Sequence, residues 1–263
     1  DILGAQQYGL GQPATENRYI RLVKNQQGQL RRDLLLQRPL DSRTDITRVV
    51  LLREIMETYG DSHKAVWIGE FGWNSSPMPT QFGAPVSEDQ KAQYIVELMQ
   101  RARREWNWLG VMNVWFLRSG ANFAPEDVTR NFQLVREDWT PLPAYTAIQN
   151  YLTSPPVVGV GAYSADHEAW RETDAGYELR FWGDQVQFET TASTVMLDGT
   201  VQDASTIKTT LGEHTLVMPE KPPMVYISRR NSSAWFWNLA PFGLLIVLIW
   251  TLYQGFKNIE HKA

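Results

Sequence analysis

The sequence contains no cysteine among its 263 residues. Disulfide bonds, thiolate catalysis and zinc–thiolate sites are therefore excluded, although the compartment stays open because many exported proteins also lack cysteine. Positive charge is scarce as well, since 25 lysine and arginine residues stand against 29 aspartate and glutamate residues, for a formal net charge of −4. A chain without a broad positive field has little to attract a phosphate backbone, so we expect no nucleic-acid partner.

Several motifs of catalysis and cofactor binding are also missing. The four histidines are scattered at positions 63, 167, 214 and 261, and the run HEAWR at 167–171 lacks the second histidine of a zinc-protease helix. No Gly-x-Ser-x-Gly elbow and no phosphate-binding Gly-Lys-Ser/Thr loop occurs, and the run GVGAYS at 159–164 lacks the third glycine of a dinucleotide loop. We therefore expect neither a metal ion nor an organic cofactor.

Aromatic residues, in contrast, are abundant. They make up 12% of the chain and include 11 tryptophans, within a total of 43% hydrophobic residues. This is enough for a large core and for more than one domain. A tryptophan surplus is typical of a heavy core, of a membrane interface or of a surface on which sugar rings stack, and composition does not choose among the three.

One long uncharged run lies near the end of the chain. Residues 234–256, AWFWNLAPFGLLIVLIWTLYQGF, carry no charge for 23 residues, and a helix of that length spans a hydrocarbon core of about 30 Å. Aromatic residues lie toward both ends of the run, as at membrane interfaces. We predict one transmembrane helix that anchors the chain in a lipid bilayer, followed by a short tail at 257–263. A buried helical hairpin in a soluble domain is the alternative.

The segment at 157–228 reads as a series of short strands. Partial alternation in GYELRFWGD and VQFETTASTVMLDGTVQ, the turn signal Asp198-Gly199, and the runs TLVMPE and MVYISRR favour a small antiparallel, sandwich-like β domain. Pro155-Pro156 separates it from the preceding residues. Its aromatic residues can form its own core, so we expect a spacer, with a sugar-binding accessory role as the alternative.

Residues 1–153 alternate between strand and helix patterns. The apolar runs at 2–9, 65–73 and 108–117 predict buried strands, and the runs at 44–60, 87–106 and 141–152 predict helices. Ser87 stands three residues before Gln90, which is the signature of a capping box. The order predicts an α/β fold with parallel strands and right-handed crossovers. The polar run at 21–43 is expected to be a long connection without chemistry.

Glu70 is the candidate for chemistry in this part of the chain. It ends the apolar run VWIG and is followed by Phe71 and Trp73. Strict alternation along a strand would place it on the same side as Val66 and Ile68, and functional side chains of α/β folds gather at the carboxyl ends of strands. A carboxylate there can be a nucleophile, an acid or base, a metal ligand or half of a structural ion pair.

Three strand motifs carry a resemblance to a known family. The run KAVWIGEFGWNSSP resembles the seventh-strand motif of the clan A retaining glycoside hydrolases, the cellulase-like (β/α)8 enzymes. DILGAQQYG resembles the sixth strand, with Tyr8 at its end, and GVMNVWFL resembles the eighth strand, with Trp115 as its sugar-stacking tryptophan. The resemblance covers about residues 1–152 and implies the C-terminal part of a (β/α)8 TIM barrel.

The resemblance also implies roles for single residues. Glu70 would be the nucleophile that forms a covalent glycosyl-enzyme, and a second carboxyl group about 5 to 5.5 Å away would act as acid and base. Tyr8 would form a hydrogen bond near the nucleophile and Trp115 would stack on the sugar, although either could be an ordinary core residue. Trp73 and Asn74 are expected to line the cleft and bind substrate, with packing beneath it as their alternative.

The sequence departs from the family pattern in two ways. No Asn-Glu pair, in which the family carries its acid/base glutamate, occurs in the chain, and about 150 residues precede the β domain where a whole barrel needs about 250. Because the chain begins with Asp1 rather than Met, we expect that it holds strands six to eight of a longer protein and is inactive as this fragment.

Two functions remain from the sequence. The first is a membrane-anchored retaining glycoside hydrolase that cleaves O-glycosidic bonds of a poly- or oligosaccharide, and the second is a non-catalytic glycosidase-like module that binds carbohydrate or serves as a scaffold. Arg229 and Arg230 precede the predicted span, while Lys257 and Lys262 follow it, so charge does not fix its orientation. The chemistry of the folded part favours the extracytoplasmic side.

Overall fold

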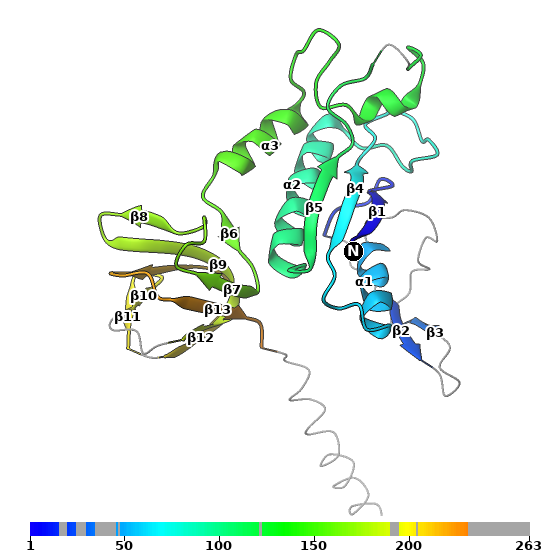
Figure 1. The fold of residues 1–263 in the computed structure, drawn as a ribbon. Coiled ribbons are helices and arrows are strands. Elements are labelled where there is room, and N and C mark those ends of the chain that lie inside the picture. Colours follow the sequence, from blue (N-terminus) through cyan, green and yellow to red (C-terminus); the bar gives the residue numbers. More distant parts are fainter. Residues whose placement is uncertain are drawn as a thin grey trace, which may run out of the picture.

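The computed structural model describes residues 1–15, 20–24, 30–34, 46, 48–120, 123–189, 195–203 and 205–230. A parallel sheet with its helices forms the first part of the chain, coloured blue to green in Figure 1, and a mainly antiparallel sheet, green to orange, stands beside it. The predicted order of an α/β part followed by a β part is confirmed.

The parallel sheet has three described strands, with β4 at its centre. Its order is β1 (Leu3–Tyr8), β4 (Val66–Gly72) and β5 (Leu109–Val114), and both pairings are parallel. Helices α1 (Arg48–Thr58) and α2 (Glu88–Glu105) precede β4 and β5, and α3 (Pro143–Thr153) follows. Three predicted strands and three predicted helices are therefore present, with ends shifted by a few residues.

Helix α2 begins at the residue that the sequence predicts. Ser87 Oγ accepts a hydrogen bond from the Gln90 N–H at 3.1 Å, and Gln90 Oε1 accepts one from the Ser87 N–H at 2.8 Å. This reciprocal capping box satisfies two backbone donors that the first turn would otherwise leave unpaired. The cap fixes where α2 starts and so fixes the length of the loop that joins it to the end of β4.

One face of the parallel sheet packs against the helices. Val66 and Ile68 of β4 are 0% exposed and share an apolar core with Val49 of α1 and Leu98 of α2. Trp67, which lies between the two strand residues, is 42% exposed. Because successive side chains of a strand point to opposite faces, one face of β4 is covered by helices and the other carries exposed side chains.

The run at 21–43, predicted to be a long polar connection, contains secondary structure. Strands β2 (Ile20–Lys24) and β3 (Leu30–Leu34) pair antiparallel, with Ile20 opposite Leu34 and Lys24 opposite Leu30. The connection between β1 and α1 therefore includes a strand pair that the sequence analysis did not predict. The run has no asparagine-glycine or aspartate-glycine turn between its two halves, so the strongest short-range hairpin signal is missing.

The β part is built on two long antiparallel strands, β9 (Gly176–Phe188) and β12 (Thr206–Met218). They lie in a sheet of order β11-β10-β12-β9-β13-β7, and β6 and β8 pair with β9 outside that path. The shorter strands are β6 (Val157–Val158), β7 (Gly161–Ser164), β8 (Arg171–Thr173), β10 (Val195–Leu197), β11 (Thr200–Gln202) and β13 (Met224–Ser228). Residues such as Leu179, Phe181 and Leu216, all 0% exposed, give this part its own apolar core.

The turn predicted at Asp198-Gly199 joins β10 to β11. Both residues have positive φ, 50° and 77°, as the favoured two-residue hairpin turn requires. Asp198 Oδ1 accepts the Thr215 N–H at 2.8 Å, and Oδ2 lies 2.7 Å from His214 Nδ1. Desolvation raises the pKa of the Asp198 carboxyl, but these two hydrogen bonds outweigh it, so the pKa lies below its ordinary value.

Asp198→Ala is expected to lower the free energy of unfolding at pH 7 by about 1–2 kcal/mol, because two hydrogen bonds of the turn are lost. A carboxyl whose pKa is depressed in the folded state stabilises above its unfolded pKa of about 3.8 and loses that contribution as the pH falls further. Urea denaturation at pH 7 and pH 3 should therefore show a smaller deficit at pH 3. Asp203→Ala, at an exposed neighbouring position, is the control, and an equal deficit in both variants would refute the turn's contribution.

The predicted transmembrane helix at 234–256 and the tail at 257–263 lie outside the described residues. Of the helices within the described ranges, none combines the length and the apolar character needed to cross a membrane.

Candidate active site

A β-bulge interrupts β4 at Gly69 and Glu70. Between β1 and β4 the register runs from Leu3↔Val66 to Ala5↔Ile68, then continues at Gln6↔Glu70, so Gly69 has no partner in β1. The pairing of β4 with β5 is also irregular between Ile68 and Phe71. Bulges are rare in parallel pairs, and their common effect is to re-aim a side chain.

The bulge turns Glu70 to the exposed face of the sheet. Ile68 and Phe71 are 0% exposed in the core, whereas Glu70 is half-buried opposite exposed Gln6. Glu70 therefore does not share a side with Val66 and Ile68, and the prediction from strict alternation is wrong. The extra residue Gly69 shifts the alternation by one position, which places the carboxylate on the face that the helices leave uncovered.

Tyr8 makes the hydrogen bond expected of it. It lies at the end of β1, two residues after Gln6 and on the same face, and its hydroxyl donates to Glu70 Oε2. Burial, followed by the hydrogen bond to Glu70 and its charge, raises the pKa of the Tyr8 hydroxyl far above its ordinary value. The hydroxyl therefore stays protonated at neutral pH, and it fixes the orientation of the Glu70 carboxylate by donating to one oxygen.

Aromatic rings gather around Tyr8. The ring centroids of Tyr8 and Phe132 are 5.5 Å apart, those of Phe82 and Phe132 are 4.9 Å apart, and those of Tyr8 and Phe82 are 6.2 Å apart. Phe82 comes from the loop after β4, and Phe132 ends the short helix η1 (Val128–Phe132) after β5. Sequence reasoning missed both residues, since an isolated phenylalanine in a loop carries no positional signal.

Gly72 allows the Trp115 backbone and the Phe132 ring to pack closely against the end of β4. A Cβ at Gly72 would lie 2.7 Å from the Trp115 carbonyl oxygen and 3.2 Å from Phe132 Cδ1. The glycine of the Glu-Phe-Gly triplet is therefore required by the close approach of the backbone just beyond β5 and of an aromatic ring. This gives a physical reason for a motif that the sequence offers only as a resemblance.

Trp115 lies directly beyond β5, next to the end of β4. Its backbone N–H donates to the Phe71 carbonyl at 2.8 Å, its side chain is half-buried, and its ring centroid is 5.2 Å from that of Phe116. The peptide bond between Trp115 and Phe116 is cis. The structure thus brings Tyr8, Glu70 and Trp115 to the carboxyl ends of three adjacent parallel strands, and a sugar-stacking role for Trp115 stays a prediction.

Trp73 does not line a cleft. Its side chain is 1% exposed, packs on Tyr94 with ring centroids 5.7 Å apart, and donates from Nε1 to the Gln12 carbonyl at 2.7 Å. The ring also occupies the space over Gly9, where a Cβ would lie 1.7 Å from Nε1. Substrate contact by Trp73 is therefore not supported, because the indole is a core group that holds the loop after β1.

Asn74 is likewise committed to internal contacts. It is 6% exposed, its Nδ2 donates to the Val128 carbonyl at 2.7 Å, and its Oδ1 accepts the Ser76 N–H at 3.0 Å. The predicted role in substrate binding is not supported, because Nδ2 holds the loop after β4 to η1 and Oδ1 is used within that loop. Arg118, just beyond β5, stacks over Trp139 at 4.3 Å and donates to the Glu137 carbonyl.

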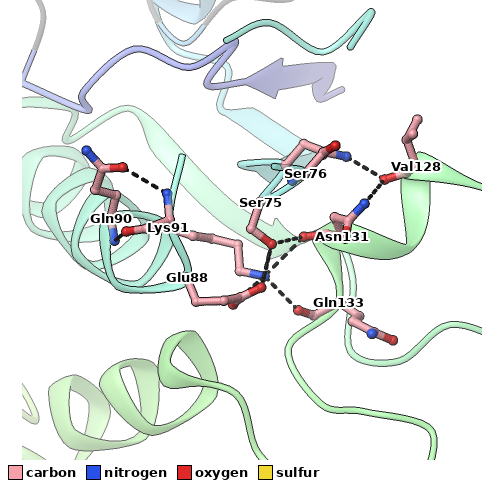
Figure 2. Close-up of polar contacts among 10 residues, drawn as sticks. Ser75, Ser76, Glu88, Gln90, Lys91, Val128, Asn131 and Gln133 are labelled. Atoms are coloured by element: carbon pink, nitrogen blue, oxygen red, sulfur yellow. Dashed lines mark hydrogen bonds and ion pairs between the residues drawn. The ribbon is translucent and has the colours of Figure 1, made fainter. Parts of the chain in front are cut away.

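Lys91 organises the loops behind the site (Figure 2). Its side chain is 0% exposed, and Nζ donates to Ser75 Oγ at 3.1 Å and to the carbonyls of Asn131 and Gln133 at 3.0 and 3.1 Å. It also forms an ion pair with Glu88 Oε2 at 2.8 Å. Burial lowers the pKa of Lys91, and the charge of Glu88 opposes that change.

This contact set links three segments that surround the aromatic rings. Ser75 belongs to the loop after β4, Glu88 to the first turn of α2, and Asn131 and Gln133 flank Phe132. Buried charges of this kind are retained where paired and hydrogen-bonded. Sequence reasoning missed Lys91, since a lysine three residues after a glutamate on a helix is typical of a solvated ion pair. Within the described ranges, no group of three or more histidine, aspartate or glutamate side chains could hold a metal ion.

Comparison with known proteins gives only a partial structural likeness. No protein-family model and no curated protein matches the chain. A family 39 glycoside hydrolase from Bacteroides cellulosilyticus WH2 is 19% identical, with a TM-score of 0.30 over 64% of this chain and 37% of that one. A β-glucuronidase from Bifidobacterium dentium, complexed with coumarin-3-O-glucuronide, is 17% identical, with a TM-score of 0.31 over 42% of this chain and 18% of that one.

A third structure, a monomeric β-xylosidase from Caulobacter crescentus CB15, is 13% identical, with a TM-score of 0.33 over 86% of this chain and 54% of that one. The chain thus spans between 18% and 54% of the length of these three solved glycoside hydrolases. The likeness is low in identity and partial in extent.

Proposed function

We propose that this chain carries the nucleophile of a retaining glycoside hydrolase, and that Glu70 is that nucleophile. The observation that carries the proposal is the carboxylate of Glu70, turned by a bulge to the exposed face at the carboxyl end of a parallel strand and held there by the Tyr8 hydroxyl. Such strand ends are where α/β folds place chemistry. Among the described residues, no lysine, arginine or histidine forms an ion pair with Glu70. This argues against the alternative that Glu70 is half of a structural ion pair.

The chemistry assigned to this carboxylate has two steps. Glu70 attacks the anomeric carbon as the glycosidic C–O bond breaks, and a second carboxyl group gives its proton to the leaving oxygen. The same group then takes a proton from water, whose oxygen displaces Glu70 and releases the sugar. Trp115 offers an apolar ring face for stacking, and exposed Gln6, opposite Glu70, offers an amide for a sugar hydroxyl.

The acid/base group is assigned to a segment outside these residues. The Asn-Glu pair in which the resembled family carries it does not occur in the 263 residues. We expect the 263-residue chain alone to show no turnover and the full-length protein to hydrolyse glycosides. The alternative function, sugar binding without turnover, becomes the better one if a neutral residue stands where the family has its acid/base glutamate.

The test is the stereochemistry of hydrolysis by the full-length protein. Aryl glycosides of several sugars are incubated with the protein, and proton nuclear magnetic resonance follows the first-formed anomer. Retention of configuration is expected, because two displacements occur at one carbon. Inversion would contradict a nucleophilic Glu70, and binding of sugars without hydrolysis of any glycoside would favour the non-catalytic module.

Tyr8→Phe is expected to lower kcat on a hydrolysed aryl glycoside by about 10²-fold, the cost of removing one aligned donor from an active site. Since the pKa of Tyr8 lies far above its ordinary value, the wild-type rate should show no fall from Tyr8 ionisation below pH 10. Tyr145→Phe, on α3 away from Glu70, is the matched control. Equal rates for wild type and Tyr8→Phe would exclude Tyr8 from the site.

We further propose that residues 234–256 anchor the protein in a membrane, with the hydrolase on the extracytoplasmic side. The support is the run of 23 uncharged residues with aromatic residues toward both ends. Removal of residues 231–263 should move the protein from the alkali-resistant membrane fraction to the soluble fraction. Unchanged fractionation would rule out this anchor.

A further inference from the structure

A cleft with both polar and apolar lining side chains lies where the two parts of the chain meet. It has a volume of about 540 Å³ and is lined by α2, α3, the start of the β part and the strands β9 and β12. In Figure 1, the antiparallel sheet stands beside the lower ends of α2 and α3. Ligand sites favour such junctions, and this volume lies within the usual range of about 300–1,000 Å³.

Two arginines from different parts of the chain meet one carboxylate at this cleft. Arg104, in the last turn of α2, lies 3.5 Å from Glu213 Oε2 through Nη2, and Arg180 of β9 forms an ion pair with Glu213 Oε1. All three side chains are about one-third exposed. Since each guanidinium has five N–H donors, one shared carboxylate leaves donors of both arginines for a ligand.

Amide and acidic side chains line the helical wall of the cleft, beside small apolar ones. Gln93, Glu97 and Gln100 follow one another at helical spacing on α2, and Gln93 Nε2 donates to Glu97 Oε1 at 2.8 Å. Asn150 and Tyr151 face them from α3. The amides donate and accept hydrogen bonds, the carboxylates accept them, and the tyrosine adds an aromatic ring.

The charges that line the cleft balance. Arg104 and Arg180 are matched by Glu97 and Glu213, so the cleft offers neither an anion nor a cation a net attraction. Donors, acceptors and a ring face without net charge fit a neutral molecule rich in hydroxyl groups, because each sugar hydroxyl both donates and accepts.

We propose that this cleft binds a neutral oligosaccharide segment, as a second carbohydrate site apart from Glu70. The proposal rests on the proposed function in one respect, namely that the bound saccharide is part of the polymer that the hydrolase cleaves. Glu70 lies on the exposed face of the sheet, whereas α2 packs on the opposite face through Leu98. The helix layer therefore separates the two sites, and the cleft holds the polymer while Glu70 acts on another part of it.

The test measures binding and hydrolysis separately in the full-length protein. Affinity electrophoresis in gels that contain barley β-glucan, soluble xylan or laminarin gives the dissociation constants, with polygalacturonate as the acidic comparison. The variant Gln100→Ala/Tyr151→Ala removes one amide and the ring, and Gln149→Ala, on an exposed neighbouring position of α3, is the matched control. Thermal denaturation checks that each variant is folded.

At least one neutral polysaccharide should retard the wild type and the Glu70→Gln variant equally. The double variant should bind it at least about tenfold more weakly, while Gln149→Ala binds as the wild type does and hydrolysis of a small aryl glycoside is unchanged in both. Unchanged binding in the double variant, no retardation of the wild type by any neutral polysaccharide, or stronger retardation by polygalacturonate would overturn the cleft site. A failure of the proposed function differs from these results, since it appears as hydrolysis that survives Glu70→Gln.

Discussion

Glu70→Gln in the full-length protein is expected to lower kcat on an aryl glycoside by more than about a thousandfold, since it removes a covalent nucleophile. The amide has nearly the shape of the carboxylate and can still accept the Tyr8 hydrogen bond, so the fold and the pocket should be preserved. It is a far weaker nucleophile toward the anomeric carbon, because the neutral amide lacks the negative charge of the carboxylate and its nitrogen lone pair is delocalised into the carbonyl. The measurement is the initial rate of aryl release at saturating substrate.

A matched control variant and a chemical rescue test whether the lost rate comes from the missing nucleophile. Glu126→Gln, at an exposed position in the loop after β5, should keep the wild-type rate. Glu70→Ala leaves room for a small anion, so added azide should restore part of the rate by attacking in place of the carboxylate. The product should be a glycosyl azide whose anomeric configuration is opposite to that of the substrate. Equal rates for wild type and Glu70→Gln would end the assignment of Glu70 as nucleophile.

Lys91→Met is expected to lower the free energy of unfolding by about 3 kcal/mol, because it leaves buried acceptors without their cation. The acceptors are Glu88 and Ser75 and the carbonyls of Asn131 and Gln133. Methionine keeps the length and apolar character of the side chain, so the loss reports the hydrogen bonds and the charge more than the volume. Urea denaturation followed by tryptophan fluorescence measures it.

Lys64→Met is the control for this change. Lys64 forms an ion pair with Asp61 at 2.8 Å, with side chains 28% and 42% exposed, and partly exposed pairs of this kind contribute less than about 1 kcal/mol. The two lysines should therefore differ by about 2 kcal/mol or more. Lys91→Met should also slow hydrolysis, because Asn131 and Gln133 flank Phe132, whose ring packs on Tyr8. A Lys91→Met variant as stable as Lys64→Met would contradict the role of the buried cation.

The elements of the parallel sheet could be predicted because local patterns specify them. The apolar runs that end at Tyr8 and Gly72 form strands, and Ser87 with Gln90 marks the start of α2 by chemistry that acts within four residues. The orientation of Glu70 could not be predicted in the same way. It depends on a bulge at Gly69, and a bulge changes the pairing between strands without changing the composition of the strand.

The roles of Trp73 and Lys91 depend on contacts between segments that lie far apart in the sequence, so local patterns did not reveal them. Trp73 and Trp115 are both tryptophans just beyond a strand, yet one is a core residue and the other is half-buried at the strand end. The Trp73 ring packs over Gly9 and on Tyr94, contacts that the sequence pattern around the tryptophan does not reveal. Lys91 has the spacing of a surface ion pair, and the carbonyls that hold it come from residues about 40 positions later. Contacts between distant segments decided these cases.

Covalent labelling of Glu70 is the most direct measurement of the nucleophile. A 2-deoxy-2-fluoro glycoside with a good leaving group forms the glycosyl-enzyme and hydrolyses it slowly, because the fluorine destabilises the positive charge that develops on the sugar. After incubation of the full-length protein and trypsin digestion, tandem mass spectrometry of the peptide 65–91, AVWIGEFGWNSSPMPTQFGAPVSEDQK, should show the fluorosugar as an ester on Glu70. A label on a different carboxylate, or steady hydrolysis of the parent glycoside with no label on Glu70, would contradict it.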